Sequence, residues 1–520
     1  MLPQAAPSSD PSPVVSVIDV GSSGIRMEVA RIGADGNVSV LEALTKAVPL
    51  GVDVFQRGHL SRQTIEATVD ALRGFKQVLA MHDPAKLRAV GTSALRDADN
   101  AETLLDRVRH ATGIDVEVID GTEENRLNLL AVQHAARGVL DLAAENAAII
   151  EVGAGSVGIT LLDKGRPVST ESQPMGSQRA LEANRRLSLG HGRYVANLRR
   201  QVRASVRKFE RNLPLSTVKL FVALGSDMRF AADRVGQAVS PSVSRIAGEA
   251  FKTFCKEIAA KDADRIAADY RIYHGDAERL LPALLTYEQI FSLTGAEALV
   301  VPRVTLRDAM ILDLAGPAAA GDLRTQVISS AMAIGRKYGT DEAHAASVAD
   351  IALQLFDALK PLHGLGTEER LYLEVAALLH DAGLFIASRA HHKHSHYIIA
   401  SSEIFGLAKD ELEIVANVAR YHRRSVPRKS HPSYMSLGRP ERLIVNKLAA
   451  VLRLADALDR EHSGRVKSIK VVEKMGSVEV WVPLAPLDLT NEQAAFDDKK
   501  DLFAEVYGKD VVLRGAAPPA

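Results

Sequence analysis

Two glycine-rich loops, each preceded by an acidic residue, are the parts of the sequence best suited to chemistry. Asp19 precedes the first loop and Glu151 precedes the second. Glycine loops that follow strands expose backbone N–H groups that can cradle phosphate oxygens, and carboxylates supply the oxygen ligands that Mg²⁺ prefers. The pairing predicts phosphate groups held by the loops and Mg²⁺ or Mn²⁺ held by the acids. The loop residues concerned are Gly21, Ser22, Ser23, Gly153, Ala154, Gly155 and Ser156.

Each of these features also has a simpler interpretation. Glycine is the usual turn residue, so either loop taken alone is more typical of a tight turn. Asp19 and Glu151 would then be acids at the ends of strands, exposed to solvent. The presence of two similar units is what favours the phosphate and metal interpretation.

The segments around the two loops have the same pattern. Residues 14–32 form an apolar run, a glycine turn and an alternating stretch, which predicts a strand, a turn and a second strand. Residues 147–165 repeat this pattern. We interpret the repeat as an internal duplication that produces two similar lobes facing a cleft.

Strands alternate with helices up to about residue 315, which predicts an α/β fold. From about residue 329 to residue 460 the periodicity is helical, and residues 468–484 alternate like a β-hairpin. The predicted division is a disordered tail (1–13), a first lobe (14–130), a second lobe (131–320), a helical domain (321–465) and a small α+β module (466–520).

Composition excludes several classes of protein. The 520 residues carry 64 basic and 64 acidic side chains, so the formal net charge of +0 gives no general attraction to nucleic acid or membranes. A single cysteine, Cys255, excludes a disulfide framework and fits a reducing compartment. No stretch approaches the roughly 20 apolar residues that span a bilayer. We expect a cytoplasmic protein with no membrane contact and no specific nucleic-acid partner.

Residues 193–211 are a local exception, with seven basic residues and one acid. A long polyanion could bind along this segment. A solvated helix face explains the same pattern equally well.

Six segments resemble, in order, the motifs of the exopolyphosphatase and guanosine pentaphosphate phosphatase family. IDVGSSGIR resembles the family's DxGSNSxR, and AVGTSALRDADN resembles ATSALRxAxN. VIDGTEENRL is similar to ISGxEEARL, and IIEVGAGSVGI takes the place of DIGGGSTEL. PMGSQRALE and ALGSDMRFAA resemble the family's later loops. The resemblance covers nearly the whole chain.

This resemblance implies an actin-like ATPase (ribonuclease H-like) fold whose two lobes close on inorganic polyphosphate or a guanosine polyphosphate. It implies that Glu124 is the general base for the attacking water, that Glu151 joins it in catalysis as a metal ligand, and that Arg96 holds a substrate phosphate. It also implies a homodimer. Without the resemblance, Glu124 would be an acid stabilised by the helix dipole, and Arg96 would pair with Asp97 or Asp99.

The sequence departs from the family's pattern at four positions of the two loops. Ser23 replaces an asparagine, Glu151 an aspartate, and Ala154 the middle glycine. Gly158 stands where the family has the glutamate of GGGSTE. The backbone cradle for phosphate is retained, whereas one expected carboxylate is lost.

The helical region contains a second set of chemical groups. His344, the pair His380–Asp381, and Asp456 resemble the HD metal-dependent phosphohydrolase superfamily, which implies a divalent metal on these four residues. A histidine cluster (His391, His392, His394, His396) resembles the family's HxHS segment and either ligates metal or lines the domain. The basic segment 420–429 could hold phosphates nearby.

The function predicted from the sequence is exopolyphosphatase activity, the metal-dependent release of phosphate from the ends of inorganic polyphosphate. Two alternatives remain open. The HD site could hydrolyse guanosine pentaphosphate or another nucleotide. Alternatively, the chain could be a catalytically weak sensor of polyphosphate or an alarmone.

Overall fold

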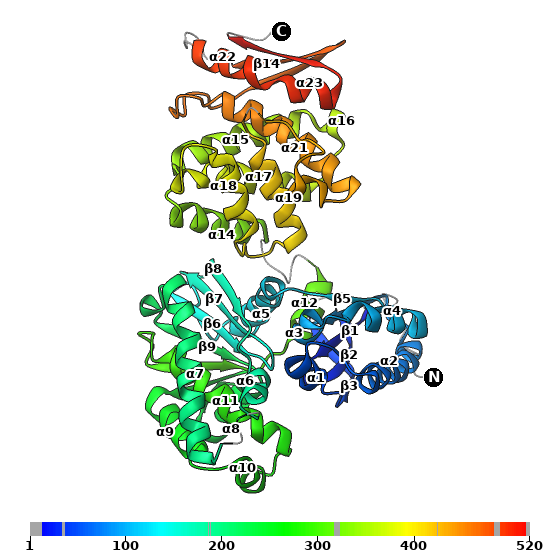
Figure 1. The fold of residues 1–520 in the computed structure, drawn as a ribbon, viewed down its shortest axis with the longest axis vertical. Helices are drawn as coiled ribbons and strands as arrows, with labels where there is room; N and C mark the ends of the chain where they lie inside the picture. Colours follow the sequence, from blue (N-terminus) through cyan, green and yellow to red (C-terminus); the bar gives the residue numbers. More distant parts are fainter. Residues whose placement is uncertain are drawn as a thin grey trace, which may run out of the picture. The chain divides into compact units, whose positions relative to one another are not determined.

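The computed structural model describes residues 13–33, 37–185, 187, 189–316, 323–423, 425–482 and 489–515. The chain forms two compact units, residues 1–322 and 323–520 (Figure 1). Apart from Pro13, the predicted disordered tail lies outside the described residues, and so does the predicted domain boundary near residue 320.

The first unit contains two sheets with the same connectivity. In the first sheet, with strand order β3-β2-β1-β4-β5, β1 is antiparallel to β2 and parallel to β4. In the second sheet, β8-β7-β6-β9-β12 repeats this order, and β11 and β10 extend it. The predicted duplication of a strand, glycine turn and strand is therefore confirmed. The strands are β1 (Val14–Gly21), β2 (Gly24–Ile32), β3 (Val38–Lys46), β4 (Lys86–Gly91), β5 (Val116–Val118), β6 (Ala147–Val152), β7 (Val157–Asp163), β8 (Arg166–Gln173), β9 (Leu220–Leu224), β10 (Gln237–Ser240), β11 (Val243–Ala247) and β12 (Ala298–Pro302).

Strand β1 is buried on both faces, which explains its nearly continuous apolar sequence. Ile18 and Val20 pack in one cluster with helices α2 (Arg62–His82) and α4 (Ala101–Thr112). Val15 and Val17 pack in another cluster with α5 (Gly121–Ala136) and α12 (Leu306–Ala315). Side chains alternate along a strand, so Asp19 lies on the α5–α12 face.

Helix α12 packs on the first sheet although it follows the second sheet in the chain. Its residues Ala309, Met310 and Ile311 are buried in the same cluster as Val15 and Val17. The lobe boundary that the sequence indicated after residue 130 falls within α5. Both helices thus connect the first lobe to the rest of the unit.

The second lobe surrounds its sheet with helices whose apolar faces form one core. Helix α7 (His191–Asn212) buries Leu198, Val202, Val206 and Phe209, one face of the helix, so the basic residues of segment 193–211 lie mostly on its exposed face. The remaining helices of the unit are α1 (Leu50–Arg57), α3 (Ser93–Asp97), α6 (Ser177–Arg185), η1 (Leu215–Thr217), α8 (Ser226–Val235), α9 (Gly248–Ala259), α10 (Ala263–Tyr270) and α11 (His274–Phe291).

The second unit is a helical bundle followed by a small sheet. Helix α21 (Arg439–Ala457) is its centre, since almost every residue from Leu448 to Ala457 is buried. The other helices of the bundle are α14 (Leu323–Lys337), α15 (Glu342–Ala358), α16 (Lys360–His363), α17 (Thr367–Leu379), η2 (Ala382–Phe385), α18 (His391–Ala400), α19 (Lys409–Arg420) and α20 (Pro432–Met435). The helical periodicity predicted from residue 329 to 460 is confirmed.

The chain ends in a three-stranded sheet, β13-β14-β15, with two helices. Strands β13 (Lys470–Lys474) and β14 (Ser477–Val482) form the predicted hairpin, whose turn at Gly476 has a φ of +83° that suits glycine. Helices α22 (Thr490–Lys499) and α23 (Asp501–Tyr507) precede β15 (Asp510–Gly515), which pairs in parallel with β14.

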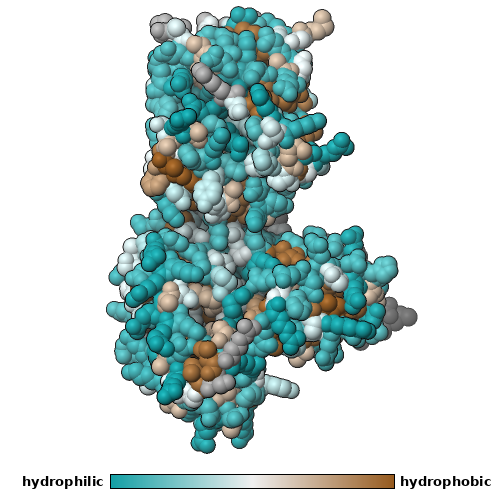
Figure 2. All heavy atoms as spheres, in the orientation of Figure 1, coloured by the Kyte–Doolittle hydropathy of each residue, from teal (hydrophilic) through white to brown (hydrophobic). Residues whose placement is uncertain are grey.

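Hydrophilic residues cover most of the face shown in Figure 2, and the hydrophobic ones form small patches. Within the described ranges, no helix has both the length and the apolar character that crossing a bilayer requires.

Candidate functional site

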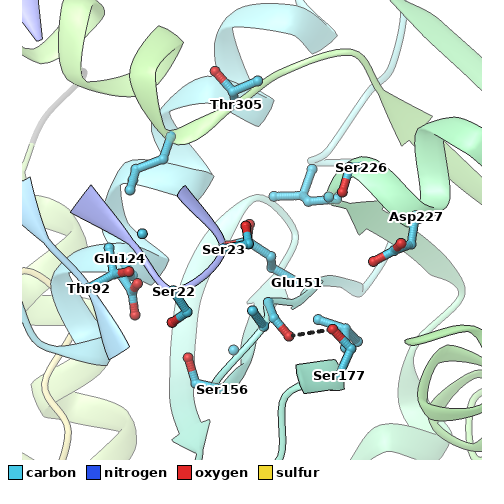
Figure 3. A pocket seen from close by; sticks show the side chains of 18 of the residues that line it. Ser22, Ser23, Thr92, Glu124, Glu151, Ser156, Ser177, Ser226, Asp227 and Thr305 are labelled. Atoms are coloured by element: carbon cyan, nitrogen blue, oxygen red, sulfur yellow. Dashed lines mark hydrogen bonds between the residues drawn. The ribbon is translucent and has the colours of Figure 1, made fainter. Parts of the chain in front are cut away.

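The two predicted loops lie at the ends of equivalent strands and face one cavity of about 470 Å³ between the two sheets of the first unit. Figure 3 shows Ser22, Ser23 and Glu151 in the middle of this cavity. Glu124 lies to one side and Asp227 to the other. The cavity is lined by most of the predicted residues, namely Asp19, Gly21, Ser22, Ser23, Glu124, Glu151, Gly153, Ala154 and Ser156.

Two predicted residues, Gly155 and Arg96, do not line this cavity. Gly155 is buried, and a side chain there would clash with Ser93 and Phe55. It therefore allows the second loop to pack closely on the first lobe, which is a reason for glycine at this position.

The carbonyl groups of the second loop are held by the start of helix α6. The N–H of Ser177 donates to Gly153 at 2.9 Å, and that of Gln178 donates to Ala154 at 2.9 Å. Ala154 lines the cavity, and its N–H has no backbone acceptor among the described residues. This N–H is a candidate donor to phosphate.

Glu124 lies in the first turn of α5. Asp120 is the N-cap of this helix, and its side chain accepts a hydrogen bond from the N–H of Glu123 at 2.9 Å. Burial raises the pKa of Glu124 to about 7, and the nearby negative charge of Glu151 adds to the increase. A carboxylate with a pKa near neutrality is suited to act as a general base.

Arg96 lowers the pKa of Glu124 but does not remove the effect of burial. Its guanidinium donates to the Oε2 atom of Glu124 at 3.1 Å and to the carbonyl of Ile119 at 2.6 Å. The arginine for which the sequence predicted a phosphate contact is thus engaged with the candidate base.

The carboxylates of Glu151 and Asp19 are also destabilised as anions. Burial raises the pKa of Glu151 and of Asp19, and each of these effects is partly offset by neighbours. The amide of Asn128 donates to Glu151 at 2.6 Å. Arg26 and Arg307 each lie 3.7 Å from Asp19.

This set of donors fits Mg²⁺. Magnesium typically binds one or two carboxylates and completes its shell with water and substrate phosphates. Asp19 and Glu151 face the same cavity as the loops. The negative charge of Asp19 raises the pKa of Glu151, and a cation in the cavity would counteract this repulsion.

Six charged residues that the sequence analysis missed also line the cavity: Arg26, Asp227, Arg229, Asp276, Arg279 and Arg307. Burial raises the pKa of Asp227 to about 7. Asp227 and Arg229 belong to ALGSDMRFAA, so this motif was a usable signal. Arg307 had no such signal, because only the return of α12 to the first sheet places it beside Asp19.

The lost carboxylate at Gly158 is explained by its neighbour Asn125. Gly158 lies opposite Glu151 in the β6–β7 pair. A Cβ atom at Gly158 would clash with the side-chain oxygen of Asn125, whose amide donates to Thr170 at 2.7 Å. The motif ISGxEEARL has alanine at the position of Asn125. Where the family's motifs have an alanine and a glutamate, this chain has Asn125 and Gly158, and these two residues are neighbours in the structure.

The second unit brings together the histidines and acids predicted to bind metal. Two groups have ligand atoms within 4.8 Å of one another: His344, His380 and Asp381, and Asp381, His391 and His422. Asp456 lies 3.7 Å from the Nε2 atom of His344 and 3.8 Å from that of His380. Of the basic segment 420–429, Arg424 lies outside the described residues.

Two family models match the chain. The model of the Ppx/GppA phosphatase family matches residues 29–317, more than half of the chain. The chain belongs to this family. A model of Ppx/GppA phosphatase domain III matches residues 327–494, so the helical part of this family member is identified as domain III.

Named relatives of this Ppx/GppA protein match over most of its length. "Guanosine-5'-triphosphate,3'-diphosphate pyrophosphatase" of Vibrio vulnificus is 23% identical over 456 residues, which are 85% of this chain and 87% of the relative. The protein of the same name from Photobacterium profundum is 24% identical over 455 residues, 85% of this chain and 87% of the relative.

A solved structure supports the actin-like α/β fold of the first unit. An exopolyphosphatase from Cytophaga hutchinsonii superposes with a TM-score of 0.53 and 20% sequence identity. The superposition covers 58% of this chain and 97% of that chain. The predicted fold class of the two lobes is therefore confirmed.

The contact between Asn125 and Gly158 generates a stability prediction. We expect Gly158→Glu to lower the free energy of unfolding by about 1–3 kcal/mol, the usual effect of forcing atoms into a packed site. We expect Asn125→Ala combined with Gly158→Glu to recover most of this loss, because the alanine vacates the space. Thermal denaturation of the two variants would measure both effects.

The matched control is Gly74→Glu on helix α2, where nothing lies within 4 Å of an added Cβ atom. This variant should unfold close to the wild-type temperature. A stable Gly158→Glu protein would show that Asn125 does not exclude the carboxylate.

Proposed function

We propose that this chain is an exopolyphosphatase, which hydrolyses the terminal phosphoanhydride bonds of inorganic polyphosphate and releases phosphate. The observation that carries the proposal is a carboxylate with a pKa of about 7, Glu124, in the same cavity as two phosphate-binding loops. Membership of the Ppx/GppA phosphatase family and the likeness in fold to an exopolyphosphatase support it.

The proposed roles follow from the placement of the groups. The loops 21–24 and 153–156 bind the phosphate oxygens through their N–H groups and hydroxyls. Glu124 orients the attacking water and accepts its proton. The water oxygen bonds to the terminal phosphorus, and the bond from that phosphorus to the bridging oxygen breaks, leaving the electron pair on the shortened chain. Mg²⁺ (or Mn²⁺) on Asp19 and Glu151 would offset the negative charge of the phosphates.

Arginines around the cavity would complete the binding of the polyanion. Arg26 and Arg307 line the cavity beside Asp19, and guanidinium groups suit phosphate oxygens. We assign Arg96 a positioning role toward Glu124, because it donates to that carboxylate and to the Ile119 carbonyl and is not among the residues that line the cavity.

A guanosine polyphosphate is the second candidate substrate of the same cavity. Beyond the loops the cavity is lined by the apolar residues Phe230, Ile272 and Leu280, which a chain of phosphates does not need and a nucleobase could contact. The name of the Vibrio vulnificus relative, a guanosine polyphosphate pyrophosphatase, agrees with this candidate.

A second site of function is proposed in the helical part of the chain. His344, His380, Asp381 and Asp456 would hold a divalent metal in the manner of HD-type phosphohydrolases. The observation that favours it is the buried Nε2 atoms of His344 and His380, which have no hydrogen-bond partner among the described residues. Unpaired buried polar atoms are costly unless a ligand satisfies them.

We also propose that the chain divides into two lobes (14–130 and 131–320), a helical HD-type domain (321–465) and an α+β module (466–520). We further propose that it is a cytoplasmic homodimer.

The first test compares phosphate release from long-chain polyphosphate in the presence of Mg²⁺. We expect Glu124→Gln to lower the rate by about 10²–10⁴-fold, the usual contribution of general-base catalysis. Asp381→Ala should leave the rate near that of the wild type, as should the control Glu102→Gln on the exposed surface of α4. Loss of release in Asp381→Ala, with Glu124→Gln active, would place catalysis in the helical part instead.

A second test follows from the contact between Arg96 and Glu124. The base acts when deprotonated, so kcat/KM should rise as the pH rises through its pKa. Removing the positive charge with Arg96→Gln raises the pKa of Glu124, and the acidic limb of the pH profile should move to higher pH.

Arg96→Lys retains the charge and is the control for the second test, with a limb closer to that of the wild type. A uniform loss of rate in Arg96→Gln, with the limb unmoved, would contradict a role through Glu124. Such a result would instead favour a direct contact between Arg96 and phosphate.

A further inference from the structure

Four buried histidines of the second unit are oriented in the same way. The Nδ1 atoms of His380 and His422 lie 2.7 Å from the carbonyl oxygens of Ala377 and Ala419. The Nδ1 atom of His391 lies 3.1 Å from a carbonyl oxygen, and that of His344 lies 2.9 Å from a carboxylate oxygen. These oxygens only accept hydrogen bonds, so each Nδ1 carries the proton. In the neutral imidazole, which has one N–H, each Nε2 then presents a lone pair.

The Nε2 atoms of His344 and His380 converge on Asp381 and Asp456. His344 and His380 are 2% and 1% exposed, and their Nε2 atoms have no hydrogen-bond partner among the described residues. The Nε2 of His380 lies 3.7 Å from one carboxylate oxygen of Asp381, Oδ2. This is the arrangement already proposed for one divalent metal.

The other two lone pairs face each other. The Nε2 atoms of His391 and His422 are 3.2 Å apart, and the second carboxylate oxygen of Asp381, Oδ1, lies 3.1 Å and 3.5 Å from them. When both rings are neutral, two lone pairs and an anionic oxygen repel one another unless a proton on one Nε2 or a metal ion lies between them. Two nitrogen ligands at about 2.1 Å from one ion are roughly 3 Å apart when they subtend a right angle. The observed separation suits ligands of a common ion.

We propose that this unit holds a pair of divalent metal ions bridged by Asp381. One ion would be bound by His344, His380, Asp381 and Asp456, and the other by Asp381, His391 and His422. The proposal rests on the HD-type site proposed above and adds a second ion to it. Imidazole and carboxylate ligands together suit Mn²⁺, Fe²⁺ or Zn²⁺.

The surroundings of the pair favour an anionic phosphate ligand. A cavity of about 500 Å³ opens over Asp381, His391, His422 and Asp456. Its wall also includes the basic residues Arg423, Arg460 and Lys499 and the acidic residues Glu461 and Asp498. Lys499 is ion-paired with Asp456. Cations around a metal pair fit a phosphate ester or anhydride.

The reaction class that fits such a centre is hydrolysis of a phosphate ester or anhydride. The oxygen of water bonds to phosphorus as the bond to the leaving oxygen breaks. The leaving oxygen keeps the electron pair and takes up a proton, while the water loses one to solvent.

The test counts Mn²⁺ ions bound to the full chain carrying Asp19→Asn and Glu151→Gln, which removes the ligands of the interlobe cavity. In this background, we expect two ions per chain by elemental analysis after dialysis. We also expect the spin-coupled paramagnetic resonance signal of two neighbouring Mn²⁺ ions.

Variants then separate the two positions. His391→Asn combined with His422→Asn should retain one ion and lose the coupling, and Asp381→Asn should lose both ions. His394→Asn, on the same helix but in neither ligand group, is the control and should retain two coupled ions. Circular dichroism melting curves would show whether each variant is folded.

Each outcome decides between the two proposals. One ion in the background protein, unaffected by His391→Asn and His422→Asn, would overturn the metal pair and leave the single HD-type site. No ion would overturn both. Inorganic phosphate should alter the signal of the pair, and Arg423→Gln with Arg460→Gln should abolish that change. A signal indifferent to phosphate would overturn the assigned ligand class.

Discussion

The cost of burying several carboxylates in one space is the constraint on which the interlobe cavity depends. Asp19, Glu124 and Glu151 come from three different elements and face one space. Raising the pKa of Glu124 from 4.5 to about 7 means that its ionisation costs about 3 kcal/mol more than in water. Arginines and an asparagine offset part of this cost. A bound cation would offset more of it, which agrees with the proposed binding of a metal and a polyanion in this cavity.

The helical part meets a similar problem with neutral ligands. Its histidines fix their Nδ1 protons on oxygens, so their lone pairs converge without adding charge. Carboxylates dominate the first centre and imidazoles the second, which explains the expectation of Mg²⁺ in one and a transition metal in the other.

Much of the fold and of the candidate site could be predicted from the sequence, because the strongest sequence patterns are local. The loops that follow β1 and β6, and the helix starting at Asp120, each depend on a few neighbouring residues. Three other features could not be predicted. The close approach of Asn125 to Gly158 joins a helix and a strand that neither motif connects. Arg307 reaches Asp19 only because α12 crosses back to the first sheet. The convergence of His391 and His422 on Asp381 likewise depends on the packing of distant helices.

The crossing of α12 has a consequence for the order in which the chain matures. Residues Ala309 to Ile311 complete the core over Val15 and Val17, which are synthesised earlier. At about 5–20 residues per second, roughly 15–60 s separate the synthesis of these two segments. During that interval one face of β1 lacks part of its cover. The first lobe therefore completes its core only after most of the second lobe has been synthesised. The two similar lobes of the first unit thus mature together.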